Sequence, residues 1–213
     1  MPTAREALLD AAVSALGALP WSGVRMVDVA SAAGVSRQTL YNEFGSKDGL
    51  ARALVRREAD VYLRGVDRVL AGHAVPVDRL VALVDWTVGS ARSSALVRAL
   101  LTGCWGERLP APRPGRAPGS HSPVPAQRRA DAGVPGPSEL VATVRDRSLA
   151  ALEKELPAVD PGEVARCCET VVRLALSYVV APDPARPGTP SGGGGHAAHV
   201  RAVLARTPIR PAP

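Results

Sequence analysis

The stretch from Met26 to Leu50 constrains the fold more than any other part of the sequence. Its first apolar residues recur at three- and four-residue steps: Met26, Val29, Ala30 and Ala33. This spacing gives a two-turn helix one apolar face. Gly34 follows, and glycine adopts the left-handed conformation of a helix C-terminus without steric cost. Ser36 is a preferred N-cap for a second helix. The pattern predicts two short helices joined by a tight turn, which is typical of a helix-turn-helix.

The second helix, predicted over Arg37–Phe44, has two chemically distinct faces. Leu40 and Phe44 lie four residues apart, so they share a face that can be buried. The opposite face carries a cation, amides, hydroxyls and one acid: Arg37, Gln38, Thr39, Tyr41, Asn42 and Glu43. Most of these groups suit a phosphate-lined groove. Gly45 then ends the helix, and Ser46 caps a third one that begins at Lys47.

The run from Ala30 to Leu50, AxxAGVSRQTLYNEFGSKDGL, resembles the helix-turn-helix of the tetracycline-repressor (TetR) family of bacterial transcriptional regulators. The resemblance continues upstream to Thr3, and it covers a quarter to a third of the chain. It implies an all-α protein with a DNA-binding domain at residues 1–50, a connecting helix at 47–70 and a helical effector-binding and dimerisation domain at 71–213. An ordinary helical hairpin with a serine-capped second helix is the alternative.

The resemblance also implies a role for the polar face of Arg37–Phe44 in the major groove of double-stranded DNA. We expect two heads of a homodimer to read the halves of a near-palindromic operator. Arg37, Gln38 and Asn42 are assigned to base edges or nearby phosphates, and Thr39, Tyr41 and Lys47 to phosphates. The full set of predicted DNA-binding residues is Ser36, Arg37, Gln38, Thr39, Tyr41, Asn42 and Lys47.

Two residues depart from the family pattern. Arg25 stands where a Ser or Thr usually caps the first helix of the motif, so that cap is either supplied elsewhere or missing, at a cost of about 1 kcal/mol. Asp28 in the first turn can compensate in part through the helix dipole. Glu43 stands where a His or an aromatic residue is common. An acid beside phosphates repels them, so Glu43 either points away or accepts from a cytosine amine.

Composition bounds the remaining possibilities. The chain has 213 residues, of which 46% are hydrophobic, but it has no run of about 20 apolar residues that could span a membrane. Charges at Arg5, Glu6 and Asp10 exclude a signal peptide, so we expect a cytoplasmic protein. Three cysteines make neither a disulfide framework nor a paired metal motif. We expect no metal and no cofactor.

The net charge of +6 is weak evidence for nucleic-acid binding because of where it lies. Residues 1–65 hold eight Lys and Arg against seven acids, whereas residues 106–137 hold five against two. The second segment is rich in Pro and Gly and has almost no apolar periodicity, which predicts a mobile loop. A basic arm that touches DNA is the alternative interpretation of this loop.

Helical periodicity covers most of the rest of the chain. Apolar spacing and caps predict helices at about 3–19, 78–92, 94–103, 139–156, 161–181 and 196–205. The helix near 78–92 is apolar on more than one side and therefore needs neighbours on both faces, or one neighbour and a cavity. The resemblance implies that the last two helices form the dimer contact. Burial within the monomer is the alternative fate of some apolar residues on 161–181.

No enzyme motif for a nucleophile elbow, a phosphate-binding loop, a dinucleotide fold or a zinc protease occurs in the sequence. His196 and His199 have no acid or cysteine close in sequence, so metal binding there is disfavoured. Cys104 and the Cys167–Cys168 pair suit buried, inert thiols better than a redox sensor. We therefore expect a regulator and no enzyme.

The expected control is release of a repressor from its operator by a small molecule that enters the second domain. Few charges occur in the helices of that domain, which favours an apolar effector. Candidate lining residues are Tyr62, Leu83, Trp86, Leu101, Trp105 and Tyr178, for all of which core packing is the alternative. The alternative function is a DNA-binding regulator without an effector, controlled by its abundance or by a protein partner.

Overall fold

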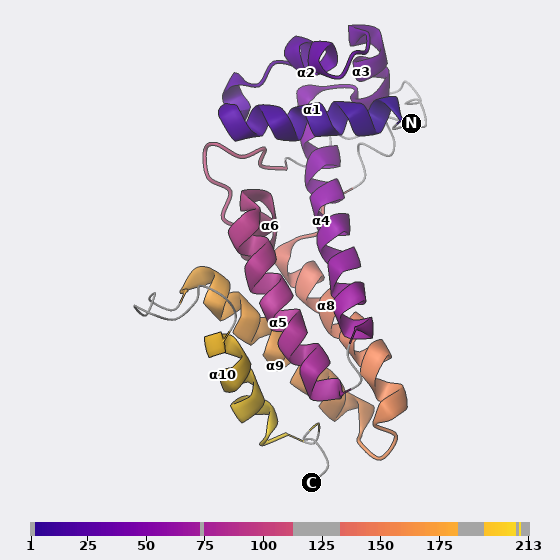
Figure 1. The fold of residues 1–213 in the computed structure, drawn as a ribbon. Helices are drawn as coiled ribbons and strands as arrows, with labels where there is room; N and C mark the ends of the chain where they lie inside the picture. The colour runs from indigo at the N-terminus through magenta and orange to yellow at the C-terminus, as the bar shows by residue number, and fades with distance from the viewer. Residues whose placement is uncertain (1–2, 73–74, 113–132, 183–193, 208, 210–213) are drawn as a thin grey trace. The chain divides into compact units, whose positions relative to one another are not determined.

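The structure is a computed structural model that describes residues 3–72, 75–112, 133–182, 194–207 and 209 (Figure 1). These residues form helices and connecting segments and no strand, which confirms the predicted all-α class. The α-helices are α1 (Ala4–Ala18), α2 (Met26–Ala32), α3 (Arg37–Phe44), α4 (Lys47–Ala71), α5 (Pro76–Ser93), α6 (Ala95–Thr102), α8 (Pro137–Leu152), α9 (Pro161–Val180) and α10 (Gly194–Leu204). A short 3₁₀ turn follows α1 at Trp21–Gly23, and another follows α8 at Glu153–Glu155.

The chain divides into two compact units. The first comprises Met1–Ala59 and Cys104–Pro135, and the second comprises Asp60–Gly103 and Gly136–Pro213. Helix α4 crosses the division, since its first half belongs to the first unit and its second half to the second. Within the described residues, no helix is both long and apolar enough to cross a membrane.

The first unit is built on α1, whose start is fixed by a capping box. The Thr3 hydroxyl accepts from the Glu6 backbone N–H at 3.2 Å, and the Glu6 carboxylate accepts from the Thr3 N–H at 2.8 Å. These two bonds satisfy N–H groups that a helix start otherwise leaves unpaired. Further along, the Arg57 guanidinium of α4 donates to Asp10 at 2.6 Å, and it also reaches the Leu9 carbonyl. Helices α1 and α4 are thereby joined.

The segment after α6 adds to this first unit. The Trp21 N–H donates to the Arg108 carbonyl at 2.9 Å, and the Arg56 guanidinium donates to the Gly133 carbonyl at 3.3 Å. The predicted mobile loop at 106–137, with its alternative role as a DNA-binding arm, falls mostly on residues 113–132, which lie outside the described residues.

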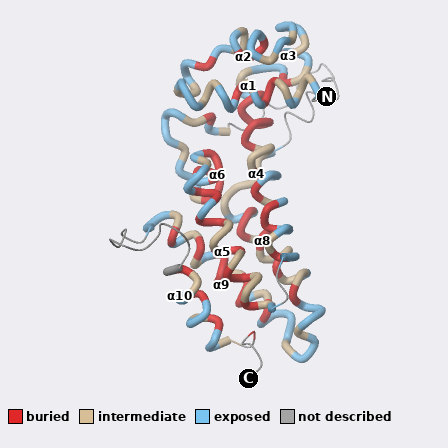
Figure 2. The backbone as a smooth tube through the Cα atoms, in the orientation of Figure 1, coloured by how far each residue is buried: buried red, intermediate tan, exposed pale blue. Residues whose placement is uncertain are grey.

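In the second unit, α9 packs against both α5 and α8, and α10 packs against α5. Figure 2 shows the buried residues concentrated along these helices. Helix α5 was predicted to need neighbours on more than one face, and it contacts α6, α9 and α10. Its buried residues are Val77, Leu80, Val81, Leu83, Val84, Thr87, Val88, Ser90 and Ala91. Helix α10 is also tied by side chains, because the Tyr178 hydroxyl lies 2.5 Å from His199 Nδ1 and His196 Nδ1 lies 4.0 Å from Asp85.

Helices α4 and α5 meet at a glycine. A Cβ atom added to Gly65 would lie 1.9 Å from Cζ2 of Trp86, so the indole ring rests directly on the α4 backbone. The same indole N–H donates to the Tyr62 carbonyl at 3.1 Å. The buried Tyr62 hydroxyl is 3.0 Å from the Thr87 hydroxyl. Residues of α4 and α5 are thus locked together by close packing and by two hydrogen bonds.

Gly65→Ala is expected to destabilise the protein by about 1–3 kcal/mol, because the new methyl group overlaps the Trp86 ring in a packed core. Gly89→Ala in α5 is the matched control. Nothing lies within 4 Å of the added methyl group there, so better helix propensity should stabilise by up to about 1 kcal/mol. Denaturant unfolding of both variants measures the two effects. If both substitutions changed the free energy of unfolding in the same direction, the close α4–α5 contact would be contradicted.

Candidate nucleic-acid interface

The helix-turn-helix is shaped by one glycine and one serine. Helix α2 ends at Ala32, and Gly34 has a φ of 67°, in the left-handed region that L side chains rarely adopt. The chain turns there, and the Val35 N–H donates back to the Ala30 carbonyl at 3.1 Å. The Ser36 hydroxyl then accepts from the Thr39 N–H at 3.0 Å and starts α3. The predicted turn and cap are both present.

The inner face of α3 is anchored by the two residues that the sequence singled out. Leu40 is 0% exposed and Phe44 is 2% exposed. The Arg5 guanidinium of α1 lies 4.7 Å from the centroid of the Phe44 ring, within the range of a cation–π contact. The same guanidinium lies 3.3 Å from the Glu43 carboxylate. Glu43 is therefore paired with α1, which favours the first of the two alternatives, that it points away from the groove, over contact with a cytosine amine.

The outer face of α3 exposes a group of polar side chains. Ser36, Arg37, Gln38, Tyr41 and Asn42 are exposed, and Thr39 is half-buried beside the cap. The Gln38 amide donates to the Asn42 side-chain oxygen at 2.9 Å, one helical turn further on. The two amides thus form one hydrogen-bonding unit. The side-chain oxygen of Gln38, its second N–H and the Asn42 amide N–H groups can still bond to base edges.

Lys47 lies beside this face at the start of α4, but it is held by the protein. Its ammonium donates to the Ser22 carbonyl at 3.2 Å and lies 5.3 Å from the centroid of the Trp21 ring. Trp21 is half-buried. These contacts fix the position of the Lys47 charge, which reduces the entropy lost when it meets a phosphate.

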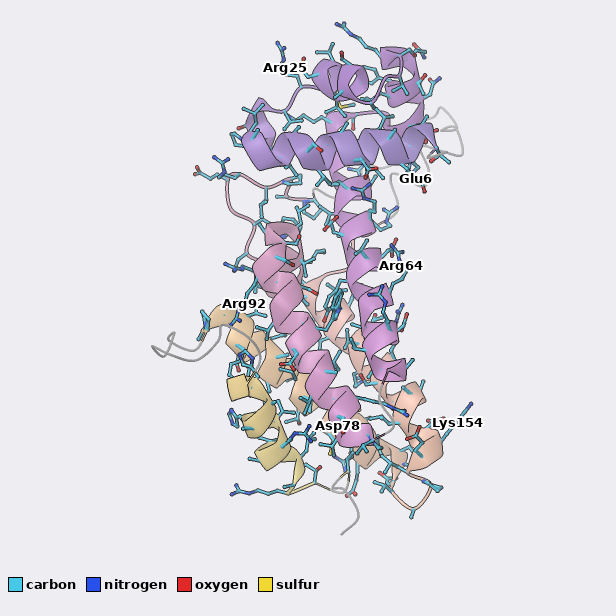
Figure 3. All side chains as sticks on the ribbon, in the orientation of Figure 1. Glu6, Arg25, Arg64, Asp78, Arg92 and Lys154 are labelled. Atoms are coloured by element: carbon cyan, nitrogen blue, oxygen red, sulfur yellow. The ribbon has the colours of Figure 1, made fainter. Side chains whose placement is uncertain are left out.

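Arg25 does not cap α2 with its side chain. Its guanidinium instead forms two hydrogen bonds with the Asp28 carboxylate, at 2.7 and 3.0 Å (Figure 3 labels Arg25). These bonds lower the pKa of Asp28 and raise that of Arg25. The missing serine cap is thus replaced by an acid in the first turn, where the helix dipole favours negative charge.

A sequence profile for bacterial regulatory proteins of the tetR family matches residues 8–54, which span α2, the turn and α3. The HTH-type transcriptional regulator AlkX of Mycobacterium tuberculosis is 51% identical over 67 residues. That match covers 32% of this chain and 30% of AlkX, so the chain aligns with less than a third of the relative's length. A longer match, to the uncharacterized HTH-type regulator Rv1255c of the same species, is 28% identical and covers 84% of this chain and 76% of the relative.

Residues 8–54 thus form a helix-turn-helix domain of the TetR family. Two solved structures share the fold. The TetR/AcrR-family regulator from Thermobifida fusca has a TM-score of 0.56 at 17% identity, with 95% of this chain and 96% of that chain covered. The TetR-family repressor AlkX from Dietzia sp. has a TM-score of 0.50 at 22% identity, with 94% and 92% covered. The described residues thus share the fold of TetR-family proteins, and residues 8–54 carry the family's helix-turn-helix.

The six residues suggested for an effector pocket are divided between the two units of the chain. Trp105 belongs to the first unit, whereas Tyr62, Leu83, Trp86, Leu101 and Tyr178 belong to the second. Tyr62 and Trp86 make the α4–α5 contact, and Leu83 is buried below it, with its carbonyl accepting from the Thr87 hydroxyl. Of the six, Tyr178 lines a cleft in the described part of the chain.

The histidines and thiols of the chain also have defined surroundings. No group of three or more His, Cys, Asp or Glu residues that could hold a metal occurs among the described residues. Cys167 and Cys168 are buried in α9, as expected, whereas Cys104 is exposed, so the expectation of a buried thiol there is wrong. Burial raises the pKa of the Cys168 thiol to about 12. The thiolate is the reactive form, so Cys168 is inert at neutral pH.

Lys47→Ala and Gln38→Ala are expected to weaken DNA binding in different ways. Loss of the Lys47 charge should weaken binding to all sequences alike and reduce the slope of log K against log salt by about one. Loss of Gln38 should change the preference among bases by about 1–3 kcal/mol at one position of the site. Fluorescence anisotropy with a site selected from random DNA, and with single-base variants of it, measures both.

Lys154→Ala is the matched control, since Lys154 is the chain's other lysine and is exposed in the second unit. It should leave both the affinity and the salt slope unchanged. Equal weakening of every DNA site by Lys47→Ala and Gln38→Ala would contradict the assignment of separate roles.

Proposed function

We propose that this protein is a TetR-family repressor that binds a near-palindromic operator as a homodimer, with α3 of each head in the major groove. The observation that carries the proposal is the division of α3 into two faces. Leu40 and Phe44 are buried, so the exposed polar face has a fixed orientation. A helix of eight residues is about 12 Å long, which suits the width of the major groove.

The proposed contacts divide into base readout and phosphate binding. Arg37 and the paired amides of Gln38 and Asn42 face base edges or the phosphates next to them. Tyr41, Thr39 and Lys47 bind phosphates and fix the register of the head, and Ser36 adds the cap that sets the start of α3. Arg37 has no ion-pair partner in the described part of the chain, so its charge is available to DNA.

The proposed dimer contact lies on α9 and α10. Burial within the monomer accounts for part of the apolar surface of α9, because Val171 and Val172 are buried. Val179 is half-buried and Val180 is 71% exposed, which leaves apolar surface at the end of the helix. A second copy that covers this surface would remove it from water, and a two-fold contact of this kind matches the symmetry of a near-palindrome.

The proposed control is release of the operator when a small, mainly apolar molecule binds the second unit. Such a ligand acts only through its difference in affinity between the DNA-binding state and the released state. A decisive shift of the population needs a difference of about 5.5 kcal/mol. The competing proposal is a regulator without an effector, controlled by abundance or a protein partner. It is favoured by the dense packing of Tyr62, Leu83 and Trp86.

A combined screen separates these two functions. The full-length protein is tested with a library of apolar metabolites for a rise in melting temperature, and each hit is tested for release of the selected operator. A true effector should stabilise the folded protein by about 2.7 kcal/mol when its concentration is a hundred times its Kd, and the melting temperature should rise accordingly. It should also weaken operator binding. If the protein binds its operator and no stabilising compound weakens that binding, the result would support the regulator without an effector. Failure to bind any DNA at low salt would overturn both.

A further inference from the structure

The second unit contains a cleft of about 160 Å³ where α5 ends, α6 lies alongside and α9 ends. Its walls combine apolar and basic side chains. Val88 and Ala91 of α5, together with Tyr178, Val179 and Val180 of α9 and Pro182 after it, form the apolar part. Arg92 and Arg98 form the basic part, and none of the described residues that line the cleft is an acid. Figure 3 labels Arg92 at the end of α5.

The two arginines differ from most arginines of this unit in their partners. Arg79, Arg147, Arg173 and Arg201 each lie within 2.7 Å of a carboxylate oxygen. Arg92, in contrast, has no hydrogen bond or ion pair to any described residue, and Arg98 donates only to the Ala91 carbonyl, at 3.2 Å. The cleft therefore holds two guanidinium groups that no described carboxylate neutralises.

Helix ends offset part of this charge. Both α5 and α9 end at the cleft, and a helix C-terminus carries about half an elementary negative charge. Two such ends against two guanidinium groups leave a surplus of about one positive charge. A single monoanion would balance it, and a carboxylate matches the two-pronged geometry of a guanidinium.

The size of the cleft limits the rest of the ligand. A cavity of about 150 Å³ accommodates benzene, so the apolar part of a ligand in this cleft has roughly six carbon atoms. The apolar walls favour a hydrocarbon tail over a second charged group.

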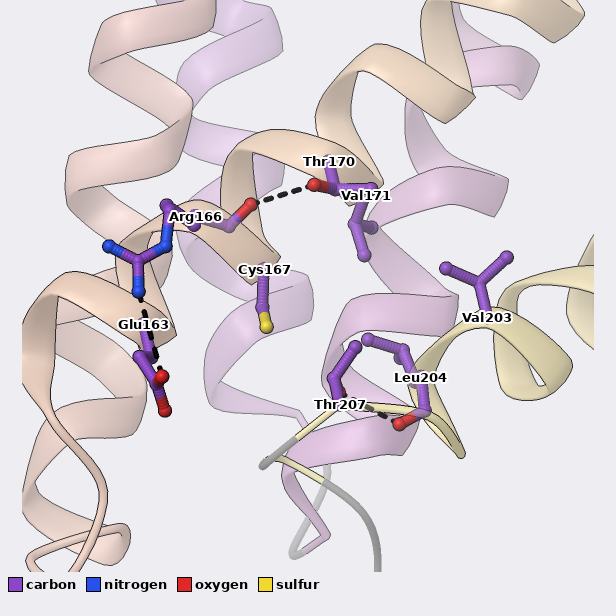
Figure 4. A pocket seen from close by; sticks show the side chains of 8 residues that line it. All are labelled: Glu163, Arg166, Cys167, Thr170, Val171, Val203, Leu204 and Thr207. Atoms are coloured by element: carbon purple, nitrogen blue, oxygen red, sulfur yellow. Dashed lines mark hydrogen bonds and ion pairs between the residues drawn. The ribbon is translucent and has the colours of Figure 1, made fainter.

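A second hollow serves as a comparison. It lies between α9 and the end of α10, and it also has a volume of about 160 Å³ (Figure 4). Its arginine, Arg166, is paired with Glu163 at 3.6 Å, and Figure 4 shows this contact at its wall. The charge of that hollow is balanced, so a bound anion would gain little there.

We propose that the Arg92–Arg98 cleft binds a small carboxylate with a hydrocarbon tail of about five or six carbons. This site extends the proposed function, because it gives the mainly apolar effector an anionic head and names the residues that recognise it. The carboxylate lies between Arg92 and Arg98, and the tail lies against Val88 and Tyr178. The ligand would thereby bridge α5 and α9, whose ends form the cleft.

Isothermal titration calorimetry of the DNA-free protein with hexanoate tests the site. Hexanoate is expected to bind, 1-hexanol at least tenfold more weakly, and each methylene removed from the acid should weaken binding about fourfold. Arg92→Gln should reduce hexanoate affinity at least tenfold, and it removes no hydrogen bond or ion pair to a described residue. Arg64→Gln, which removes an exposed arginine of α4 outside the cleft, should leave affinity within twofold.

Two results would overturn the site. One is equal affinity for hexanoate and 1-hexanol. The other is an unchanged hexanoate affinity both in Arg92→Gln and in the double variant Arg92→Gln, Arg98→Gln. Operator binding is measured separately by anisotropy, so the two proposals can fail separately. Arginine-dependent binding that leaves operator affinity unchanged would support the cleft and count against release by this ligand. Release by another compound without hexanoate binding would overturn the cleft alone.

Discussion

The burial of Leu40 and Phe44 is the constraint on which the DNA-binding face depends. Phe44 is the chain's only phenylalanine, and it is held from α1 by the Arg5 guanidinium above its ring. If these two side chains were free to leave the core, a helix as short as α3 would have little stability of its own. Their burial both stabilises α3 and fixes which of its residues face outward. The sequence-reading surface is thus set by two residues that need never touch DNA.

Local ion pairs complete the electrostatics of the head. Glu43 lies beside Arg5, Asp28 is bonded to Arg25, and Asp10 is bonded to Arg57. Carboxylates that would otherwise repel phosphates are therefore partly neutralised inside the protein. The small charge surplus of residues 1–65 consequently understates the attraction that DNA meets, because Arg37 on the outer face of α3 has no such pair in the described part of the chain.

The head could be predicted from sequence because its signals are local. The turn glycine at position 34, the cap at Ser36 and the pair Leu40 and Phe44 all lie within eleven residues of one another. The second unit could not be predicted in the same way. Trp86 suggested a pocket wall, but Gly65, 21 positions earlier, provides the surface on which it packs. The Arg92–Arg98 cleft also needs the end of α9, some 80 residues further along the chain, and no periodicity relates positions so far apart.

Helix α5 connects the proposed ligand to α4. Arg92 lies six residues after Trp86, or about 9 Å along the helix. Trp86 in turn packs on Gly65 and donates to the Tyr62 carbonyl, so a shift of α5 against α9 acts on α4 through close packing and a hydrogen bond. Packed contacts of this kind have few alternative arrangements, and a small displacement at one end favours one arrangement over another.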